Sequence, residues 1–533
     1  MKSLVFAAFA AFGAACAGAQ SASELLLPPP GEVERRYVPA RFRLDRVIVE
    51  GVTAIPQSEI AAAVERFVGQ SVGGEELREM VRLVDALYEA RGHVGTRTRL
   101  DDQPIVAGAV RLRVTEQRLS RIDIEGNFWN RRKFIEWSAW PPTAGIVHLP
   151  SLQGRLAQLK DSGLFERVAA DLRLAAPGSE EAGIRLDVVE ALPFSVSASV
   201  ANNRAPSVGS VRREIAASHR SLLGWGDTLA VRLGRTRGLD DSEIGYTAPI
   251  PLTPIAVFVR RVRSDSLAID PPVFRSLDIV AISDTDAFGA TATLLKAERL
   301  SLAAGVSRER RETITYLLGI PFSFTPGLPD GLSTFNITRG SLEGGWRGER
   351  TSISARLGYS RGRIGEVVEV GDGLGLSQRF GYVQAGFGMI HRLETRGELR
   401  VRLEGQRATQ PLPPVERLAI GGSSTVRGYR ENLMLRESGV LAGIEWRLPE
   451  RELSSWARLG SALFVDTGWG RDRNRRDATL PSAIASAGVA VDLTLWKHLR
   501  MAAAFGIPNR RHLTPRDDLQ DRGIHLAVSL SYP

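Results

Sequence analysis

The sequence predicts a β-rich α+β fold, in which two small N-terminal βααββ domains precede a transmembrane antiparallel β-barrel. Three observations lead to this prediction. The chain starts with an export signal, one arrangement of strands and helices occurs twice, and the C-terminal part alternates between polar and apolar residues. Together these features are typical of a protein that is exported and then inserted into a membrane as a barrel.

The N-terminal residues have the features of an export signal. Lys2 provides a positive charge, Leu4 to Ala15 form a short apolar run, and Ala17 to Ala19 offer a cleavage site of small residues. The apolar run is too short to cross a bilayer as a helix. We therefore expect residues 1–19 to be a signal peptide. We expect residues 20–40, which contain three consecutive prolines, to be a linker.

The segment after the linker is an internal repeat. The sequence RVIVEG at Arg46 to Gly51 recurs as RIDIEG at Arg121 to Gly126. The repeat unit also ends alike, because VRLRVTE at Val110 to Glu116 matches IRLDVVE at Ile184 to Glu190. An opening strand and a closing strand that recur at nearly constant spacing indicate two copies of one structural unit.

Helices are expected between the strands of each unit, because apolar residues recur there at helical spacing. In the first unit the apolar stripes are Ile60, Val64, Phe67 and Val68, then Leu77, Met80, Val81, Val84, Leu87 and Tyr88, and in the second unit Leu152, Leu156 and Leu159. Each unit thus reads as strand, two helices and two strands. We place the first domain at residues 41–118 and the second at residues 119–193.

From residue 194 to residue 533 the pattern changes to period two. For example, Leu399, Val401 and Leu403 alternate with Arg400 and Arg402. Soluble β-sandwiches also alternate, but the export signal and the length of this region favour a transmembrane barrel. We expect 16 strands, for which this length allows roughly 21 residues per strand with its connection, ~10 of them spanning the membrane. The alternation alone does not determine the number of strands.

A turn-rich segment of the barrel region, IGGSSTVRGYREN, contains the consecutive residues Val426, Arg427, Gly428 and Tyr429. A single arginine on a glycine-containing turn is a candidate latch if a carboxylate is available inside the barrel. The tetrapeptide alone is a weak signal, because Arg-Gly pairs occur in many ordinary turns. Its interpretation therefore depends on a partner elsewhere in the barrel.

The expected partner is Asp466, in the sequence ALFVDTGWG. Alternate residues of a strand share one face, so Phe464, Asp466 and Gly468 point one way and Val465 the other. Asp466 would then face the lumen, where its ion pair with Arg427 would be partly dehydrated and bidentate. The alternative is that Arg427 is a solvated loop arginine and Asp466 an unrelated carboxylate.

Composition and motifs argue against several other classes of function. The chain has 69 basic and 60 acidic residues, a net charge of +9, but its arginines are dispersed rather than gathered on a nucleic-acid-binding module. Its seven histidines lack metal-ligand spacing. The glycine-rich stretch GDGLGLS has no lysine and no helix after it, so it is not a P-loop. We therefore expect no enzymatic activity, no cofactor, no metal and no nucleic-acid partner.

The whole pattern resembles the two-partner secretion transporters of the haemolysin-activator and filamentous-haemagglutinin-exporter type, in the superfamily that also contains the barrel-assembly insertases. The two repeat units resemble polypeptide-transport-associated (POTRA) domains. VRGYREN resembles the motif of the family's sixth extracellular loop, which folds back into the barrel, and FVDTG resembles the inner-wall motif that receives its arginine.

This resemblance implies a protein of the bacterial outer membrane, with its POTRA domains in the periplasm and its barrel in lipid. Its partner would be a secreted exoprotein, large and β-helical, that the POTRA domains recognise in the unfolded state. The exoprotein would pass through the barrel of a monomeric transporter without ATP. An insertase or assembly factor of the same superfamily is the alternative, and the repeated units argue against a passive porin-like channel.

Overall fold

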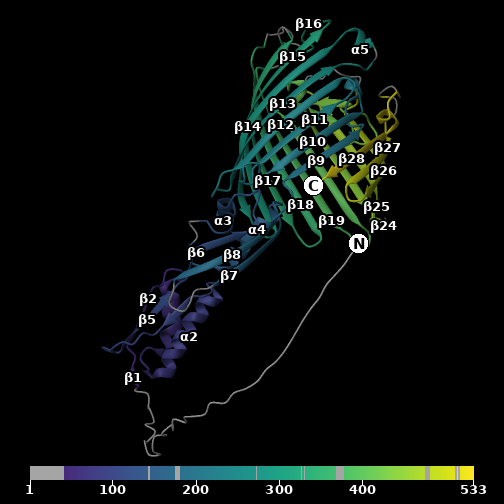
Figure 1. Cartoon of the computed structure of the whole chain (residues 1–533). Coiled ribbons are helices and arrows are strands. Elements are labelled where there is room, and N and C mark those ends of the chain that lie inside the picture. The colour runs from purple at the N-terminus through teal and green to yellow at the C-terminus, as the bar shows by residue number, and fades with distance from the viewer. Residues whose placement is uncertain are drawn as a thin grey trace, which may run out of the picture. The chain divides into compact units, whose positions relative to one another are not determined.

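The computed structural model describes residues 41–141, 145–173, 180–271, 273–325, 327–328, 331–367, 377–473, 480–510, 513 and 517–532. These residues form two POTRA domains and a closed antiparallel β-barrel (Figure 1). The predicted signal peptide and linker, residues 1–40, lie outside the described residues. In the described ranges, no helix has the length and the apolar composition that a membrane span requires.

The first POTRA domain contains a three-stranded sheet and two helices. The elements are β1 (Phe42–Arg43), β2 (Arg46–Glu50), α1 (Gln57–Val64), η1 (Glu65–Phe67), β3 (Ser71–Val72), α2 (Gly74–Ala90), β4 (Arg97–Arg99) and β5 (Ala109–Thr115). The sheet order is β2-β5-β4, and β2 runs parallel to β5. Ile60, Met80 and Val84 of the predicted apolar stripes are completely buried in the core, whereas Val68, which follows η1 in an extended conformation, is 41% exposed.

The second POTRA domain repeats this arrangement. It contains β6 (Arg118–Glu125), α3 (Arg132–Ala139), α4 (Leu149–Asp161), β7 (Phe165–Arg173) and β8 (Glu181–Glu190). The sheet order is β6-β8-β7, with β6 parallel and β7 antiparallel to β8. Leu152 and Leu159 pack in its core with Ile135 and Leu186. The order of strands and helices predicted from the sequence repeat is therefore confirmed.

The barrel consists of 16 spanning strands. In chain order they are β9 (Phe194–Ala201), β10 (Arg212–Arg220), β11 (Thr228–Arg235), β12 (Leu239–Pro249), β13 (Ile255–Leu267), β14 (Val280–Lys296), β15 (Leu300–Leu317), β17 (Leu332–Arg347), β18 (Thr351–Ile364), β19 (Arg379–Arg392), β20 (Glu398–Ala408), β23 (Ser438–Arg447), β25 (Ala457–Arg471), β26 (Ala483–Leu495), β27 (Leu499–Pro508) and β28 (Ile524–Tyr532). Neighbouring strands are antiparallel, and β28 closes the barrel by pairing with β9. The predicted barrel and its strand number are confirmed.

Shorter elements occur at the ends of the spanning strands and in their connections. They are η2 (Pro206–Val208), α5 (Val273–Ser276), β16 (Ile320–Pro321), η3 (Pro414–Glu416), β21 (Leu418–Ile420), β22 (Met434–Arg436), β24 (Arg451–Ser454) and η4 (Gln520–Arg522).

The two faces of the barrel wall follow the period-two pattern of the sequence. On β20, Leu403 is 43% exposed on the outer surface. The preceding residue, Arg402, instead donates hydrogen bonds to the backbone oxygens of Ser424 and Thr425, which lie in the lumen. Polar residues therefore line the interior, while aliphatic residues cover the outer surface, as expected for a barrel surrounded by lipid.

The connection between β20 and β23, residues 409–437, folds into the lumen, and we call it the inner loop. It carries η3 and the small β21–β22 ladder. Ile420, Val426, Tyr429 and Met434 of the loop pack with apolar side chains of the barrel wall. The loop is thus a packed part of the interior, and it contains the VRGY tetrapeptide.

Candidate functional site

The backbone of the inner loop is in close contact with the barrel wall at Gly428. This residue has φ +91°, in the left-handed region where glycine is favoured. A Cβ atom at this position would lie 2.9 Å from the backbone of Gly506 on β27. The backbone N–H of Gly428 also donates to Nε2 of His525 on β28, at 3.1 Å. Glycine at this position therefore allows the tight turn that presents Arg427 to the wall.

Arg427 reaches Asp466 on β25 with two hydrogen bonds. Nε donates to Oδ2 at 2.7 Å and Nη2 donates to Oδ1 at 3.1 Å, while the backbone N–H of Arg427 also contacts Oδ2 at 3.2 Å. The Asp466 side chain is completely buried. The third arm of the guanidinium, Nη1, donates to Glu445 on β23 at 2.5 Å. The sequence predicted the first partner of the arginine but not Glu445.

Two inner-wall residues near Asp466, Phe464 and Gly468, complete the binding site for Arg427 and its loop. The guanidinium carbon lies 3.6 Å from the ring centroid of Phe464, as in a cation–π contact. A Cβ atom on Gly468 would come within 2.5 Å of Ile420, so only a glycine leaves room for the loop. Phe464, Asp466 and Gly468 all face the lumen, on the face that strand alternation predicts.

Burial and the neighbouring charges have opposite effects on the pKa of Arg427. Burial by itself lowers the pKa of Arg427, but the hydrogen bonds and charges of Asp466 and Glu445 outweigh it and raise the pKa. The guanidinium therefore keeps its charge inside the barrel. The hydrogen bonds fix the geometry of this desolvated Arg427–Asp466 pair. Removal of one partner would leave the charge of the other buried without its counter-ion.

The remaining residues of the tetrapeptide bind elsewhere on the wall. Val426 is completely buried in the apolar cluster of the loop. The hydroxyl of Tyr429 donates to the side-chain oxygen of Asn509 at 2.7 Å and accepts from the backbone N–H of Arg510 at 3.1 Å. Burial raises the pKa of Tyr429. Tyr429 therefore ties the loop to the end of β27.

The two residues after the tetrapeptide extend this attachment, and sequence reasoning missed both. Arg430 makes a bidentate ion pair with Asp521, at 2.8 and 2.6 Å. The carboxylate of Glu431 accepts hydrogen bonds from the backbone N–H and the hydroxyl of Ser423, at 2.7 and 2.6 Å. Burial raises the pKa of Glu431. The two consecutive charged residues after VRGY could have indicated these contacts. The ion-pair partner of Arg430, however, is distant in the sequence and could not be identified from it.

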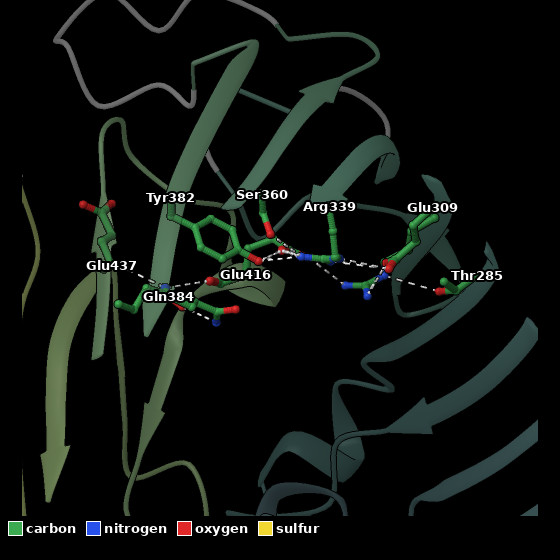
Figure 2. A network of polar contacts seen from close by, with 10 residues as sticks. Thr285, Glu309, Arg339, Ser360, Tyr382, Gln384, Glu416 and Glu437 are labelled. Atoms are coloured by element: carbon green, nitrogen blue, oxygen red, sulfur yellow. Dashed lines mark hydrogen bonds and ion pairs between the residues drawn. The ribbon is translucent and has the colours of Figure 1, made fainter. Parts of the chain in front are cut away.

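A second polar network holds the first part of the inner loop. Figure 2 shows Glu416 of η3 between Tyr382 and Arg339, with Glu309 on the other side of Arg339. Arg339 on β17 donates to both carboxylate oxygens of Glu416, each at 3.0 Å. Tyr382 on β19 donates to Glu416 at 2.5 Å, and Arg311 on β15 lies 3.5 Å away. The Glu416 side chain is only 2% exposed.

The two ends of the inner loop meet at Gln406. Its side-chain nitrogen donates to the backbone oxygens of Glu416 and Glu437, at 3.0 and 3.2 Å. The loop is therefore attached near its start by Glu416, at its ends by Gln406, and in its middle by Arg427. These attachments use strands between β15 and β25, which form one continuous stretch of the wall.

An open cavity of about 540 Å³ borders the Arg427–Asp466 ion pair, and it is lined by Arg400, Arg402, Arg427, Glu445 and Asp466. Charged side chains therefore surround the free space next to the loop. In the described parts of the chain, no group of three or more His, Cys, Asp or Glu side chains is placed to hold a metal ion.

Comparisons with known proteins agree with this architecture. Residues 180–495 match the family of haemolysin secretion/activation proteins ShlB/FhaC/HecB, and residues 42–117 match the ShlB-type POTRA domain. The outer membrane transporter CdiB of Dickeya dadantii is 22% identical over 84% of this chain and 80% of its own length. CdiB-2 of Burkholderia pseudomallei is 24% identical over 37% of this chain, and the match spans 33% of that relative.

The solved structure of CdiB from Escherichia coli has the same fold. It superposes with a TM-score of 0.67 at 18% identity, over 95% of this chain and 93% of that one. The relatives are outer-membrane transporters, and the POTRA domains of this family are periplasmic. The chain therefore belongs to the ShlB/FhaC/HecB family of haemolysin secretion/activation proteins, as an outer-membrane β-barrel protein with periplasmic POTRA domains.

Proposed function

We propose that this protein is a two-partner secretion transporter, which moves an exoprotein from the periplasm through its barrel to the cell surface. The observation that carries the proposal is a polar lumen filled by a loop that is attached through hydrogen bonds and ion pairs. Such attachments can break and re-form, so the loop can act as a gate. The family match over the barrel supports the same function.

The lining of the lumen suits an unfolded polypeptide. Arg232 on β11 pairs with Glu243 on β12 at 3.0 Å, and Arg212 on β10 pairs with Glu214 and Asp241. Charged and polar side chains like these can satisfy the N–H and C=O groups of an extended chain in transit. The same groups would be costly to place in lipid.

Arg427 serves in this proposal as the latch of the gate. With Arg427 on Asp466 and Glu445, the tetrapeptide is held on β23 and β25 beside the charged cavity. Release of the guanidinium would let the middle of the loop move away from this wall, while Glu416 still holds its first part. The arginine is then a conformational element, and it need not contact the exoprotein.

The POTRA domains would capture the exoprotein before it reaches the barrel. We infer that an unfolded segment adds a strand to an exposed sheet edge, a common mode of peptide recognition. In the second domain β7 is an edge strand of nine residues, long enough for such pairing. The exoprotein would be large and β-helical.

An exposed aromatic residue marks a route from the second domain to the barrel. Phe128 is 81% exposed, and its loop is held because Glu190 accepts the backbone N–H groups of Phe128 and Trp129 at 2.8 and 2.6 Å. The neighbouring Asn130 accepts a hydrogen bond from Ser221, in the connection between β10 and β11. Phe128 is therefore positioned to contact an apolar side chain of the passing exoprotein.

We also infer that transport needs no ATP and that a monomer is sufficient. The protein resides in the outer membrane, whose periplasmic side has no ATP. Folding of the exoprotein outside the cell would then make the movement irreversible. The surrounding outer-membrane lipid would be the only other partner.

Co-expression tests the proposal. The exoprotein encoded beside this chain is expressed in an outer-membrane-bearing host, with and without this protein, and its protease-accessible fraction on intact cells is measured. The proposal expects surface delivery only when this protein is present. Equal delivery without it overturns the proposal. A loss of many resident outer-membrane proteins instead of the exoprotein would show an insertase.

A further inference from the structure

The outer surface of the barrel carries a row of arginines near the cell-surface end. The chain enters the barrel at Phe194, at the periplasmic end of β9, so Ala201 marks the opposite, cell-surface end of that strand. Residues paired across an antiparallel ladder share one face. Near this end Val200 pairs with Arg213, and Arg213 pairs with Arg235 on β11.

The direction of these side chains follows from their neighbours. Arg212 points into the lumen, where it pairs with Asp241 and Glu214, so the next residue, Arg213, points outward. Val200 is 46% exposed on the same outer row. Arg263 on β13 belongs to this row as well, since it pairs with Ser242, two residues along β12 from Asp240, the ladder partner of Arg235.

Below these arginines lies an apolar groove of about 650 Å³ on the outer surface of the barrel. It crosses the closing junction between β28 and β9. Its floor consists of outward aliphatic side chains, and its cell-surface rim carries Arg213, Arg235 and Arg263. The aliphatic residues are Val200, Ile215, Leu233, Val528 and Leu530. The groove is therefore amphipathic, with its charged part toward the outside of the cell.

The rim has positive charge that the described protein does not fully neutralise. Arg235 pairs with Asp240 at 3.1 Å and Arg263 with Asp265 at 3.5 Å. All four side chains are about half exposed or more, so these pairs are weak and exchangeable. No carboxylate of the described residues forms an ion pair with Arg213.

The same asymmetry continues around the barrel. Arg361 and Arg363 on β18, Arg379 on β19 and Arg407 on β20 are exposed at the cell-surface ends of their strands. Each lacks an ion-pair partner among the described residues. The periplasmic end of the outer surface instead carries Phe194, Trp346, Trp446 and Tyr532, which are typical of a membrane interface.

We propose that the groove binds a phosphorylated lipid of the outer leaflet. The acyl chains would lie on Val200, Leu233 and Val528, and the headgroup phosphates would accept hydrogen bonds from Arg213, Arg235 and Arg263. Guanidinium groups bind phosphate in a bidentate way and lose less hydration than ammonium groups do. Because the groove spans β28 and β9, the bound lipid would brace the strands that close the barrel.

Lipid retention tests this proposal. The full-length protein in phosphatidylcholine nanodiscs is mixed with bisphosphorylated lipid A, and lipid that remains bound is counted by native mass spectrometry. The variant Arg213→Gln/Arg235→Gln/Arg263→Gln is expected to retain about tenfold less lipid A, the effect of losing one or two charge-assisted hydrogen bonds. The parent protein is expected to retain dephosphorylated lipid A as poorly as this variant retains the phosphorylated form.

The matched control is Arg299→Gln/Arg350→Gln/Arg396→Gln, which removes three exposed arginines from periplasmic turns. It is expected to retain lipid A like the parent. Equal retention by the rim variant and the parent, or equal binding of phosphorylated and dephosphorylated lipid, overturns the proposal. If the triple rim variant fails to form a heat-modifiable barrel, Arg213→Gln, which breaks no ion pair among the described residues, is assessed by the same criteria.

Discussion

At the scale of single residues, the attachment of the inner loop depends on a buried charge. Asp466 is completely buried and accepts two guanidinium hydrogen bonds and one backbone hydrogen bond from Arg427. Truncation of the arginine would leave this carboxylate buried with only weaker partners. For truly buried pairs the typical cost is ~3–5 kcal/mol.

We expect Arg427→Ala to loosen the inner loop and to increase ion conductance of the barrel in planar bilayers. The reason is that Asp466 and Glu445 repel each other once the guanidinium between them is removed. The control is Arg356→Ala, which removes a lumenal arginine that pairs with Glu343 at 3.3 Å rather than with the loop. Equal conductance of Arg427→Ala and the control variant would refute the role of the latch.

A second prediction at this scale concerns Gly428. Gly428→Ala would place a methyl group against the backbone of Gly506 and would also strain the positive φ. We expect the variant to release the loop, as shown by faster proteolysis within residues 409–437. Gly319→Ala separates the two effects, because Gly319 has φ +76° but no atom within 4 Å of its Cβ position. It should cost only about 1 kcal/mol. If both variants behave alike, steric contact with Gly506 is unimportant.

The sequence allowed us to predict the Arg427–Asp466 proximity because strand alternation assigns Asp466 to the lumen. It did not reveal Glu445 or His525. Alternation states which face a residue occupies, but it does not state which strands a loop will reach. Glu445 and His525 lie on other strands of the wall, so their approach to the tetrapeptide depends on the tertiary path of the loop.

At the scale of elements, the inner loop is held at sites that different strands supply. Arg339, Tyr382 and Arg311 hold Glu416 from β17, β19 and β15, whereas Arg427 uses β23 and β25. The first part of the loop can therefore remain attached while its middle moves. In the proposed gate, this arrangement would restrict the motion to the tetrapeptide and its neighbours.

We expect Glu416→Gln to free the start of the loop without releasing the tetrapeptide. The neutral amide loses the two charge-assisted bonds to Arg339 and leaves Glu309 as the one carboxylate that pairs with this arginine among the described residues. Hydrogen exchange should become faster in residues 412–420 but not in residues 424–430. The control Glu343→Gln removes a lumenal carboxylate that is 54% exposed and pairs with Arg356 rather than with the loop, so it should change neither segment. Faster exchange across the entire loop would show that the two attachments are not independent.

The hydrogen bond between Tyr88 of helix α2 and Glu116 makes the stability of the first POTRA domain depend on pH. Tyr88 is completely buried and its hydroxyl donates to Glu116 at 2.7 Å. Burial, and then Glu116, raise the pKa of Tyr88. Its contribution to stability is therefore complete below the ordinary tyrosine pKa of about 10 and is lost as the pH rises through the higher pKa of the folded state.

We expect Tyr88→Phe to lower the Tm at neutral pH, because Glu116 loses a donor, by an amount equivalent to about 1 kcal/mol. The difference from the parent should shrink at alkaline pH. Calorimetric scans of the full protein between pH 7 and pH 11 measure this. A difference that grows with pH would contradict the assignment.

At the scale of the whole molecule, the internal repeat and the period-two alternation predicted the fold class. Both are local patterns, which can be recognised without knowing which residues are in contact in the folded protein. The strand RVIVEG and its copy RIDIEG indicated two equal units, and the alternation around Leu399 to Leu403 indicated a barrel wall. The second network around Glu416 could not be predicted. Its members lie on β15, β17 and β19, which are near neighbours in the wall, but strand alternation does not show that the inner loop will bring Glu416 to them.

Surface delivery of the exoprotein by latch variants tests the central claim most directly. The exoprotein is co-expressed with the parent, with Arg427→Ala or with Arg356→Ala, and its protease-accessible amount on intact cells is normalised to barrel abundance. The gate mechanism predicts that Arg427→Ala reduces delivery by about tenfold or more, whereas Arg356→Ala matches the parent. Full delivery by Arg427→Ala, at equal barrel abundance, would contradict it.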